Sequence, residues 1–189
     1  MAMRAARTDW TVEMLDALPD DGQRYEIIDG ELFVTPSPSD AHQYLVGELH
    51  ARLLTYLRGS DVGYPTISPS DVRREDRRRN RVQPDIFVVR VTNGRRPAFP
   101  FALADLLLTI EVESPSNPRY DYHTKRELYL SAGIPEYWIV SPSARTINRW
   151  RHADDPGEIL AASLVWQPPE MSQPFVLDLP EFFAEALGD

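Results

Sequence analysis

The 189-residue chain contains no cysteine. This absence excludes disulfides, thiolate zinc sites, iron–sulfur clusters and cysteine nucleophiles, and it makes a cytoplasmic location our expectation. Long hydrophobic runs are also missing, because the longest apolar stretches, near 106–110 and 137–140, are far shorter than the ~20 residues that span a bilayer. No apolar segment typical of a signal peptide follows Met1. With 42% apolar residues, we expect one soluble domain over residues 1–189 and no membrane partner.

Lysine is scarce: it occurs once, at Lys125, and arginine supplies the other 19 of the 20 basic residues. The net charge of -9 argues against a protein that coats nucleic acid nonspecifically, since such binding requires many basic contacts to phosphates. Basic residues nevertheless concentrate in RREDRRRNR at 73–81. Two interpretations of this segment stay open: a solvated hairpin tip, or a loop that contacts substrate phosphates through residues such as Arg77 and Arg78.

The first third of the chain predicts a helix, a hairpin and a second helix. Thr11 is a suitable N-cap for VEMLDAL, and Pro19 ends that helix. The two apolar strands of RYEIIDGELFVTP are joined across Asp29-Gly30, which is a strong hairpin signal. Leucines and valines at helical spacing then predict a longer helix over about 40–57 that packs on a sheet.

The remaining chain predicts strands on both sides of one more helix. VGYPTI and SPSDVR are β-leaning pieces whose prolines favour edge positions, whereas DIFVVRV and LLLTIEVE are the continuous apolar runs typical of buried central strands. A helix over about 120–132 precedes the strands EYWIVS and RTINRWR, and Phe182 and Phe183 would close the core. This order predicts an α/β fold, a mixed β-sheet flanked by helices.

Three acids lie at the ends of the two buried strands. Asp85 begins the strand in VQPDIFVV, and Glu111 and Glu113 end the strand in LLLTIEVESPS. Because side chains alternate along a strand, Glu111 and Glu113 should project from one face and could form a cluster with Asp85. Clustered carboxylates repel one another unless a cation lies between them, and oxygen ligands suit Mg²⁺ or Mn²⁺. The pattern therefore predicts a site for a hard divalent cation.

The helix that follows carries the lysine on its apolar face. Lys125, Leu128, Tyr129 and Ala132 have the spacing of one helical face. A buried lysine is costly unless it meets carboxylates or a phosphate, so Lys125 could orient an attacking water or neutralise a transferring phosphoryl group. The alternative is that its side chain extends past the helix edge to solvent. Convergence with the acids favours the first interpretation.

Pro84-Asp85 followed by Glu111-Val112-Glu113 resembles the PD-(D/E)XK nuclease superfamily. More closely, RYEIIDGELFVTPSPSDAHQ, VQPDIFVV, IEVESPSN and YDYHTKRELYLSAGIPEYWIV, in this order and spacing, resemble the family of "putative restriction endonucleases" that is expanded in cyanobacteria. The resemblance covers a core of about 11–150. It implies a restriction endonuclease-like sandwich that hydrolyses DNA, with Asp85, Glu111 and the main-chain carbonyl of Val112 binding Mg²⁺ or Mn²⁺.

The chain departs from the superfamily pattern at Glu113, where a lysine is usual two residues after the acid. The family that the chain resembles shows the same absence and looks as though its lysine has moved to the following helix, at the place of Lys125. Two consequences stay open. In the first, Glu113 tunes a site that still hydrolyses DNA. In the second, Glu113 changes the local charge and the set of metal ligands so that hydrolysis is lost.

Other polar residues near these motifs have both a structural and a functional interpretation. Glu26 would pair with a nearby arginine or serve as an accessory acid of the site. His42 would be a hydrogen-bonded histidine at the core edge or would face the site. Gln83 could contact substrate or order water, and the hydroxyl of Tyr129, a packing residue, could approach a carboxylate. No histidine spacing indicates a zinc enzyme, and no serine lies in the pattern of a nucleophile.

Three functions are compatible with the sequence. The leading one is a DNA endonuclease, for which a homodimer would cut both strands because one site cuts one strand. The second is a catalytically inactive module that keeps the fold and binds nucleic acid or protein, which the acidic composition and Glu113 favour. The third is a metal-dependent hydrolase of another phosphate ester.

Overall fold

The computed structural model describes residues 9–19, 21–35, 37–74, 79–114 and 120–188. The elements in chain order are α1 (Val12–Asp16), β1 (Arg24–Ile28), β2 (Glu31–Thr35), α2 (Asp40–Leu57), β3 (Gly63–Ile67), β4 (Val72–Arg73), β5 (Arg81–Val82), β6 (Ile86–Arg90), β7 (Phe101–Ala102), the 3₁₀-helix η1 (Leu103–Asp105), β8 (Leu106–Val112), the π-helix η2 (Tyr120–Lys125), α3 (Arg126–Ser131), β9 (Tyr137–Ser141), β10 (Thr146–Trp150), β11 (Glu158–Leu160), β12 (Ser163–Trp166), β13 (Phe175–Asp178) and α4 (Leu179–Leu187).

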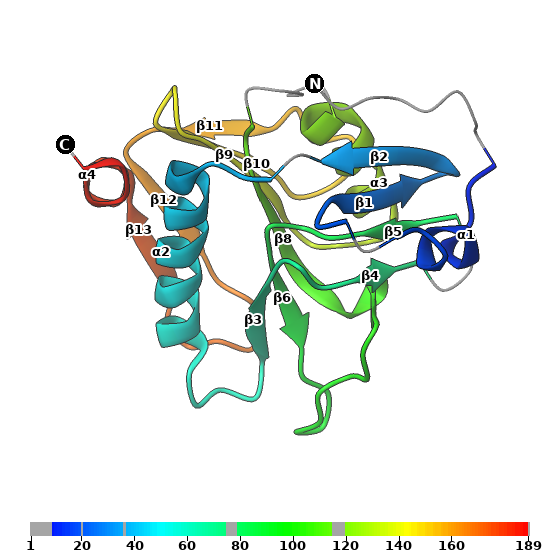
Figure 1. Cartoon of the computed structure of the whole chain (residues 1–189). Coiled ribbons are helices and arrows are strands. Elements are labelled where there is room, and N and C mark those ends of the chain that lie inside the picture. Colours follow the sequence, from blue (N-terminus) through cyan, green and yellow to red (C-terminus); the bar gives the residue numbers. More distant parts are fainter. Residues whose placement is uncertain (1–8, 20, 36, 75–78, 115–119, 189) are drawn as a thin grey trace.

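A six-stranded mixed sheet in the order β11-β10-β9-β8-β6-β3 forms the centre of the fold (Figure 1). Strand β8, buried along its whole length, pairs antiparallel with β6 and parallel with β9. The predicted central strands are therefore confirmed as neighbours, and β3, which contains Pro65, lies at the sheet edge as expected. The register pairs Ile86 with Ile110, so the start of β6 and the end of β8 lie at the same edge.

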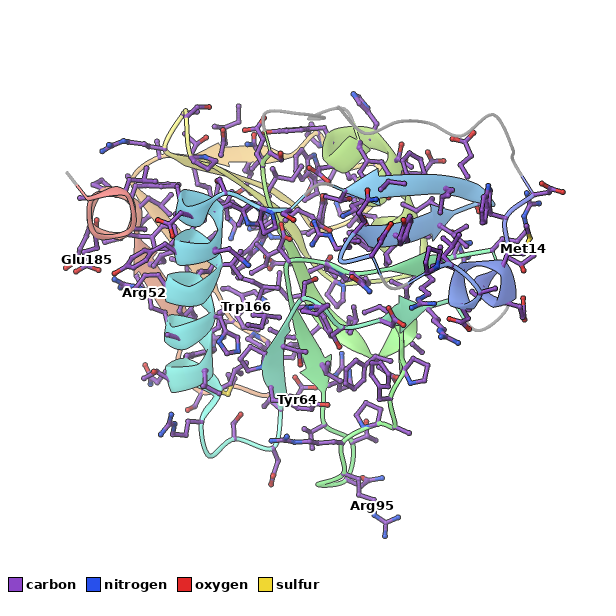
Figure 2. The ribbon with its side chains drawn as sticks, in the orientation of Figure 1. Met14, Arg52, Tyr64, Arg95, Trp166 and Glu185 are labelled. Carbon is purple, nitrogen blue, oxygen red and sulfur yellow. The ribbon has the colours of Figure 1, made fainter. Side chains whose placement is uncertain are left out.

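Helix α2 covers one face of this sheet over the predicted range. Ser39 caps it, because its side chain accepts a hydrogen bond from the main-chain N–H of His42. Leu45, Leu49 and Leu53 are fully buried against the sheet. Helix α4 lies beside α2, and Arg52 of α2 pairs with Glu185 of α4 (Figure 2). Trp166 of β12 packs against Tyr56 of α2. The aromatic pair of α4, Phe182 and Phe183, is fully buried in the same core, as predicted.

The predicted hairpin between β1 and β2 is also confirmed. Asp29 and Gly30 both have positive φ, 50° and 82°, as a two-residue turn that matches the strand twist requires. The hairpin belongs to a second sheet, β2-β1-β5-β4-β7, which the sequence did not predict. Figure 1 shows α2 to the left of β6 and β8 and the hairpin to their right, so the central strands lie between them.

One predicted helix differs in its first turns. The range 120–132 was expected to be α-helical, but Tyr120–Lys125 is a π-helix and only Arg126–Ser131 is α-helical. The wider turns keep Tyr120 and Lys125, five residues apart, on one side, with Nζ of Lys125 5.1 Å from the centroid of the Tyr120 ring. Such π-segments often occur at functional sites. Within the described ranges, no helix has the length and apolarity needed to cross a membrane.

Truncation of the buried face of α2 should destabilise the fold. Leu49→Ala removes a fully buried side chain, so we expect the free energy of unfolding in urea to fall by ~2–5 kcal/mol. Leu54→Ala in the same helix is the matched control, because Leu54 is 37% exposed and should cost less than ~1 kcal/mol. Equal losses in the two variants would contradict the packing of α2 on the sheet.

Candidate active site

The side chain of Lys125 lies inside the protein, surrounded by carboxylates. It is 2% exposed, and its Nζ is 2.9 Å from Oε1 of Glu111, 3.3 Å from Oε2 of Glu26 and 3.9 Å from Oδ1 of Asp121. Burial lowers the pKa of Lys125, but these three carboxylates outweigh burial and raise that pKa above its ordinary value. Lys125 is therefore a charged residue held within the site, and the interpretation that it extends to solvent is wrong.

Glu111 accepts two hydrogen bonds through one oxygen. It lies near the end of β8 and is 2% exposed, and its Oε1 accepts from Nζ of Lys125 at 2.9 Å and from the hydroxyl of Tyr129 at 2.8 Å. Burial raises the pKa of Glu111 from its ordinary 4.5 to about 8, because the neighbouring acids Asp85 and Asp121 add to burial and outweigh the opposing charge of Lys125. The predicted proximity of the Tyr129 hydroxyl to a carboxylate is thus observed.

Asp85, the residue before β6, is held by three donors. Its Oδ1 accepts from Nη1 of Arg24 at 2.9 Å. Its Oδ2 accepts from the main-chain N–H of Val112 at 2.9 Å and lies 3.1 Å from Nε2 of His42. Burial raises the pKa of Asp85, but the hydrogen bond with His42 and the charge of Arg24 hold it well below its usual range. His42 therefore faces the site and positions Asp85.

Glu26 joins the cluster from the hairpin. It is fully buried in β1, and its Oε1 accepts a hydrogen bond of 2.8 Å from the main-chain N–H of Gln83. Its Oε2 faces Lys125 but makes no hydrogen bond within the described residues. The side chain of Gln83 donates to Oδ1 of Asp71 at 2.9 Å. Gln83 thus fixes Glu26 through its main chain, and its side chain points to a different acid.

Sequence reasoning missed two charged members of the site, Arg24 and Asp121. Arg24 precedes Glu26 by two positions in β1, and the alternation of side chains along a strand could have placed both on one face. Asp121 precedes Lys125 by four positions, which is ion-pair spacing. Burial raises the pKa of Asp121 from its ordinary 3.8 to about 6, against the charge of Lys125.

Some predicted site residues are not brought into the cluster. Glu113 follows β8, and its Oε2 accepts a 2.5 Å hydrogen bond from the hydroxyl of Ser141. In the part of the chain that the structure describes, no contact joins Glu113 to Asp85 or Glu111. The expectation that the three acids form one cluster is therefore wrong for Glu113, whose main-chain N–H still pairs with the carbonyl of Val140 in β9 but whose carboxylate contacts the neighbouring Ser141. Arg77 and Arg78 lie outside the described residues.

The cluster carries more negative than positive charge. It gathers two cations and four carboxylates: Arg24, Lys125, Glu26, Asp85, Glu111 and Asp121. Two unbalanced negative charges in a buried environment are costly, which is why the pKa values of Glu111 and Asp121 are raised. A divalent cation would balance this excess, and carboxylate oxygens are the ligands that Mg²⁺ and Mn²⁺ prefer.

The donor set therefore fits a hard divalent cation in charge and chemistry. The unbonded, buried Oε2 of Glu26 is consistent with this deficit of positive charge. Among the described residues, however, no three histidine or acidic side chains already surround one point as a metal site would. Asp85 and Glu111 instead pair with Arg24 and Lys125, so an ion at these carboxylates would share them with those two cations.

A pocket of about 350 Å³ opens beside Asp85. Its walls come from β1, the start of α2 and the segment before β6, and they are partly polar. The polar lining includes Arg24, His42, Gln43, Ser68, Gln83 and Asp85. Its volume lies within the ~300–1,000 Å³ of ligand pockets, and Arg24 and Asp85 are the members of the cluster that line it.

Comparisons with known proteins identify a family and similar solved structures. The family model "Uma2: Putative restriction endonuclease" matches residues 12–185. A crystal structure described as "a putative nuclease belonging to DUF820" from Anabaena variabilis ATCC 29413 is similar over 94% of this chain and 99% of that chain, with a TM-score of 0.76 and 18% identity. No curated protein matches the chain. The family match confirms the motif resemblance, and the structural match confirms the α/β fold class.

The raised carboxyl pKa values make stability depend on pH in a defined direction. Between about pH 4.5 and pH 8, native Glu111 retains a proton that the unfolded chain has released. We therefore expect the free energy of unfolding of the metal-free protein to fall as pH rises through this window, by at most ~1.4 kcal/mol per pH unit for one proton. Asp121, with a pKa of about 6, adds in the same direction.

Urea unfolding in EDTA at several pH values measures this slope. Glu111→Gln should flatten it, since the amide does not titrate, whereas Glu127→Gln, at an exposed position of α3, should leave it unchanged. A stability that rises with pH across the window, or an unchanged slope in Glu111→Gln, would show that Glu111 is ionised in the native protein.

Proposed function

Because the chain belongs to the Uma2 family, described as putative restriction endonucleases, we propose that it is a metal-dependent endonuclease that hydrolyses DNA phosphodiester bonds. The observation that carries the proposal is the burial of the only lysine, Lys125, against Glu111 and Glu26, beside a second strand-end acid, Asp85. A charged lysine is expensive to bury among apolar strands, and a structural role alone does not require a pocket beside Asp85.

Mg²⁺ or Mn²⁺ would be held by Asp85 and Glu111, with the main-chain carbonyl of Val112 as a further oxygen ligand. When bound, such an ion polarises the phosphodiester and lowers the pKa of a bound water. The excess of two negative charges in the fully ionised cluster supports this cofactor, because a bound cation would offset the burial and the repulsion between acids that raise the pKa values of Glu111 and Asp121.

Residues of the chain itself orient the reacting groups. The ammonium of Lys125 donates to Glu111, and its charge can orient an attacking water or stabilise the phosphoryl oxygens as they gain charge. Glu26 holds Lys125 in place, and the Tyr129 hydroxyl holds Glu111. His42 is a positioning residue, since its Nε2 contacts Asp85.

One observation bears on the alternative of an inactive binding module. Glu113 takes the position of the usual superfamily lysine, which by itself favours loss of hydrolysis. In the structure, however, Glu113 contacts Ser141, and Lys125 reaches Glu111 from η2. A lysine is therefore supplied to the strand-end acid from the helix, which supports retained hydrolysis.

Cleavage of supercoiled plasmid DNA with Mg²⁺ or Mn²⁺ tests the proposal. We expect the wild-type protein to nick or cut the plasmid and to lose this activity in EDTA. Lys125→Met should lower the rate by ~100-fold or more, as removal of one transition-state-stabilising group does in other enzymes. Arg95→Gln is the control, because Arg95 is exposed and lies at the tip of the loop after β6 (Figure 2).

Removal of Lys125 leaves buried carboxylates uncompensated and also weakens the fold. Rates are therefore compared at a temperature where circular dichroism shows each variant folded. Wild-type rates in folded Lys125→Met would remove Lys125 from the mechanism. A folded wild-type protein that leaves DNA intact with either ion would favour the inactive module.

A further inference from the structure

Both carboxylate oxygens of Asp85 are already occupied by donors. Arg24 contacts Oδ1, while His42 and the main-chain N–H of Val112 contact Oδ2. These contacts use three of the about four lone-pair directions of the carboxylate, and the remaining one, on Oδ1, lies beside the guanidinium of Arg24, whose positive charge repels a divalent cation. Binding of the ion to Asp85 is therefore opposed by Arg24, and departure of a donor from the carboxylate would favour it.

The structure indicates which donor can leave. The N–H of Val112 belongs to the central strand β8 and cannot move without breaking the sheet. The His42 side chain is 11% exposed and is anchored on α2. The Arg24 side chain is 21% exposed, is long, and carries the same charge sign as the incoming ion. Arg24 is thus the donor that yields, and Oδ1 is the oxygen that it exposes.

Arg24 has a place to go, since it lines the 350 Å³ pocket beside Asp85. The neighbouring polar side chains in that lining, such as Gln43 and Ser68, are uncharged. A guanidinium released from a carboxylate is stabilised by pairing with another anion, and its planar fork of N–H donors matches the oxygens of a phosphate. The anion expected in a pocket at this site is a phosphate group of the substrate.

We propose that Arg24 is the counter-ion of Asp85 in the metal-free protein and binds a substrate phosphate in the pocket once a divalent cation occupies Asp85. The proposal rests on the proposed function, because it takes Asp85 as a metal ligand and a phosphodiester as substrate. It adds an exchange of partners: the ion and Arg24 compete for one carboxylate oxygen, and the displaced Arg24 contributes to substrate binding.

This exchange predicts that substitution of Arg24 has opposite effects on the binding of the metal ion and on the binding of the substrate. Without Arg24, the ion no longer has to displace a charged donor, so metal binding becomes tighter. The same substitution removes a phosphate contact, so substrate binding becomes weaker. A purely structural role for Arg24 would weaken both, because a distorted site would hold neither ligand well.

Calorimetric titration of the DNA-free protein with MnCl₂ tests the first effect, and KM for plasmid cleavage at saturating Mn²⁺ tests the second. For Arg24→Gln we expect Mn²⁺ affinity to rise about tenfold or more and KM to rise about tenfold, each reflecting one charge-assisted hydrogen bond. Arg95→Gln, which removes an exposed arginine after β6, should change neither quantity.

Unchanged or weaker Mn²⁺ binding in folded Arg24→Gln, or an unchanged KM, would overturn the proposal while leaving the proposed function intact. If wild-type protein neither binds Mn²⁺ nor cuts DNA, the proposed function fails and the exchange fails with it. Should Arg24→Gln not fold, Arg24→Lys carries the test, since it keeps the charge but loses the planar fork. A KM equal to wild type in Arg24→Lys would then overturn the role in phosphate binding.

Discussion

The site depends on the burial of one ammonium group, Nζ of Lys125, between Glu111 and Glu26. Taking this charge out of water is costly, and several ion pairs together must offset the cost. The carboxylates that pair with Lys125 come from three separate elements: β1 of the hairpin, the central strand β8 and the π-helix η2. The hairpin, the sheet and the π-helix must therefore be assembled together before the lysine is compensated. The geometry of the candidate active site is in this sense a consequence of the whole fold.

Two acids at one sheet edge have different protonation behaviour, and the difference comes from their neighbours. Asp85 is held by three donors, so its pKa is low despite its burial. For Glu111, burial together with the nearby acids outweighs the charge of Lys125 and raises the pKa to about 8. A pair of carboxylates with separated pKa values is common at catalytic centres. Here the difference between the two pKa values also shows where positive charge is lacking. Arg24 supplies positive charge beside Asp85, and a divalent ion would supply the remainder.

Local patterns in the sequence predicted the elements and most of the cluster. The bounds of α2 and the Asp29-Gly30 hairpin follow from capping, spacing and turn chemistry, which are local. Asp85, Glu111 and Lys125 could be expected to converge because strand ends and helix faces have fixed periodicities. The contact between Arg24 and Asp85 joins β1 to the residue before β6, 61 positions away in the chain, so only packing determines it. The π-helix and the position of Glu113 likewise depend on where neighbouring elements end, which periodicity does not specify.

The central claim is that the buried carboxylates Asp85 and Glu111 form a divalent-cation site. A crystal structure of the protein soaked in MnCl₂, with data collected at a wavelength where manganese scatters anomalously, tests it most directly. The account predicts an anomalous peak bonded to Asp85 and Glu111, with Arg24 withdrawn from Oδ1 of Asp85. Saturating Mn²⁺ with no peak at these carboxylates, and with the contacts of Arg24 and Lys125 unchanged, would contradict it.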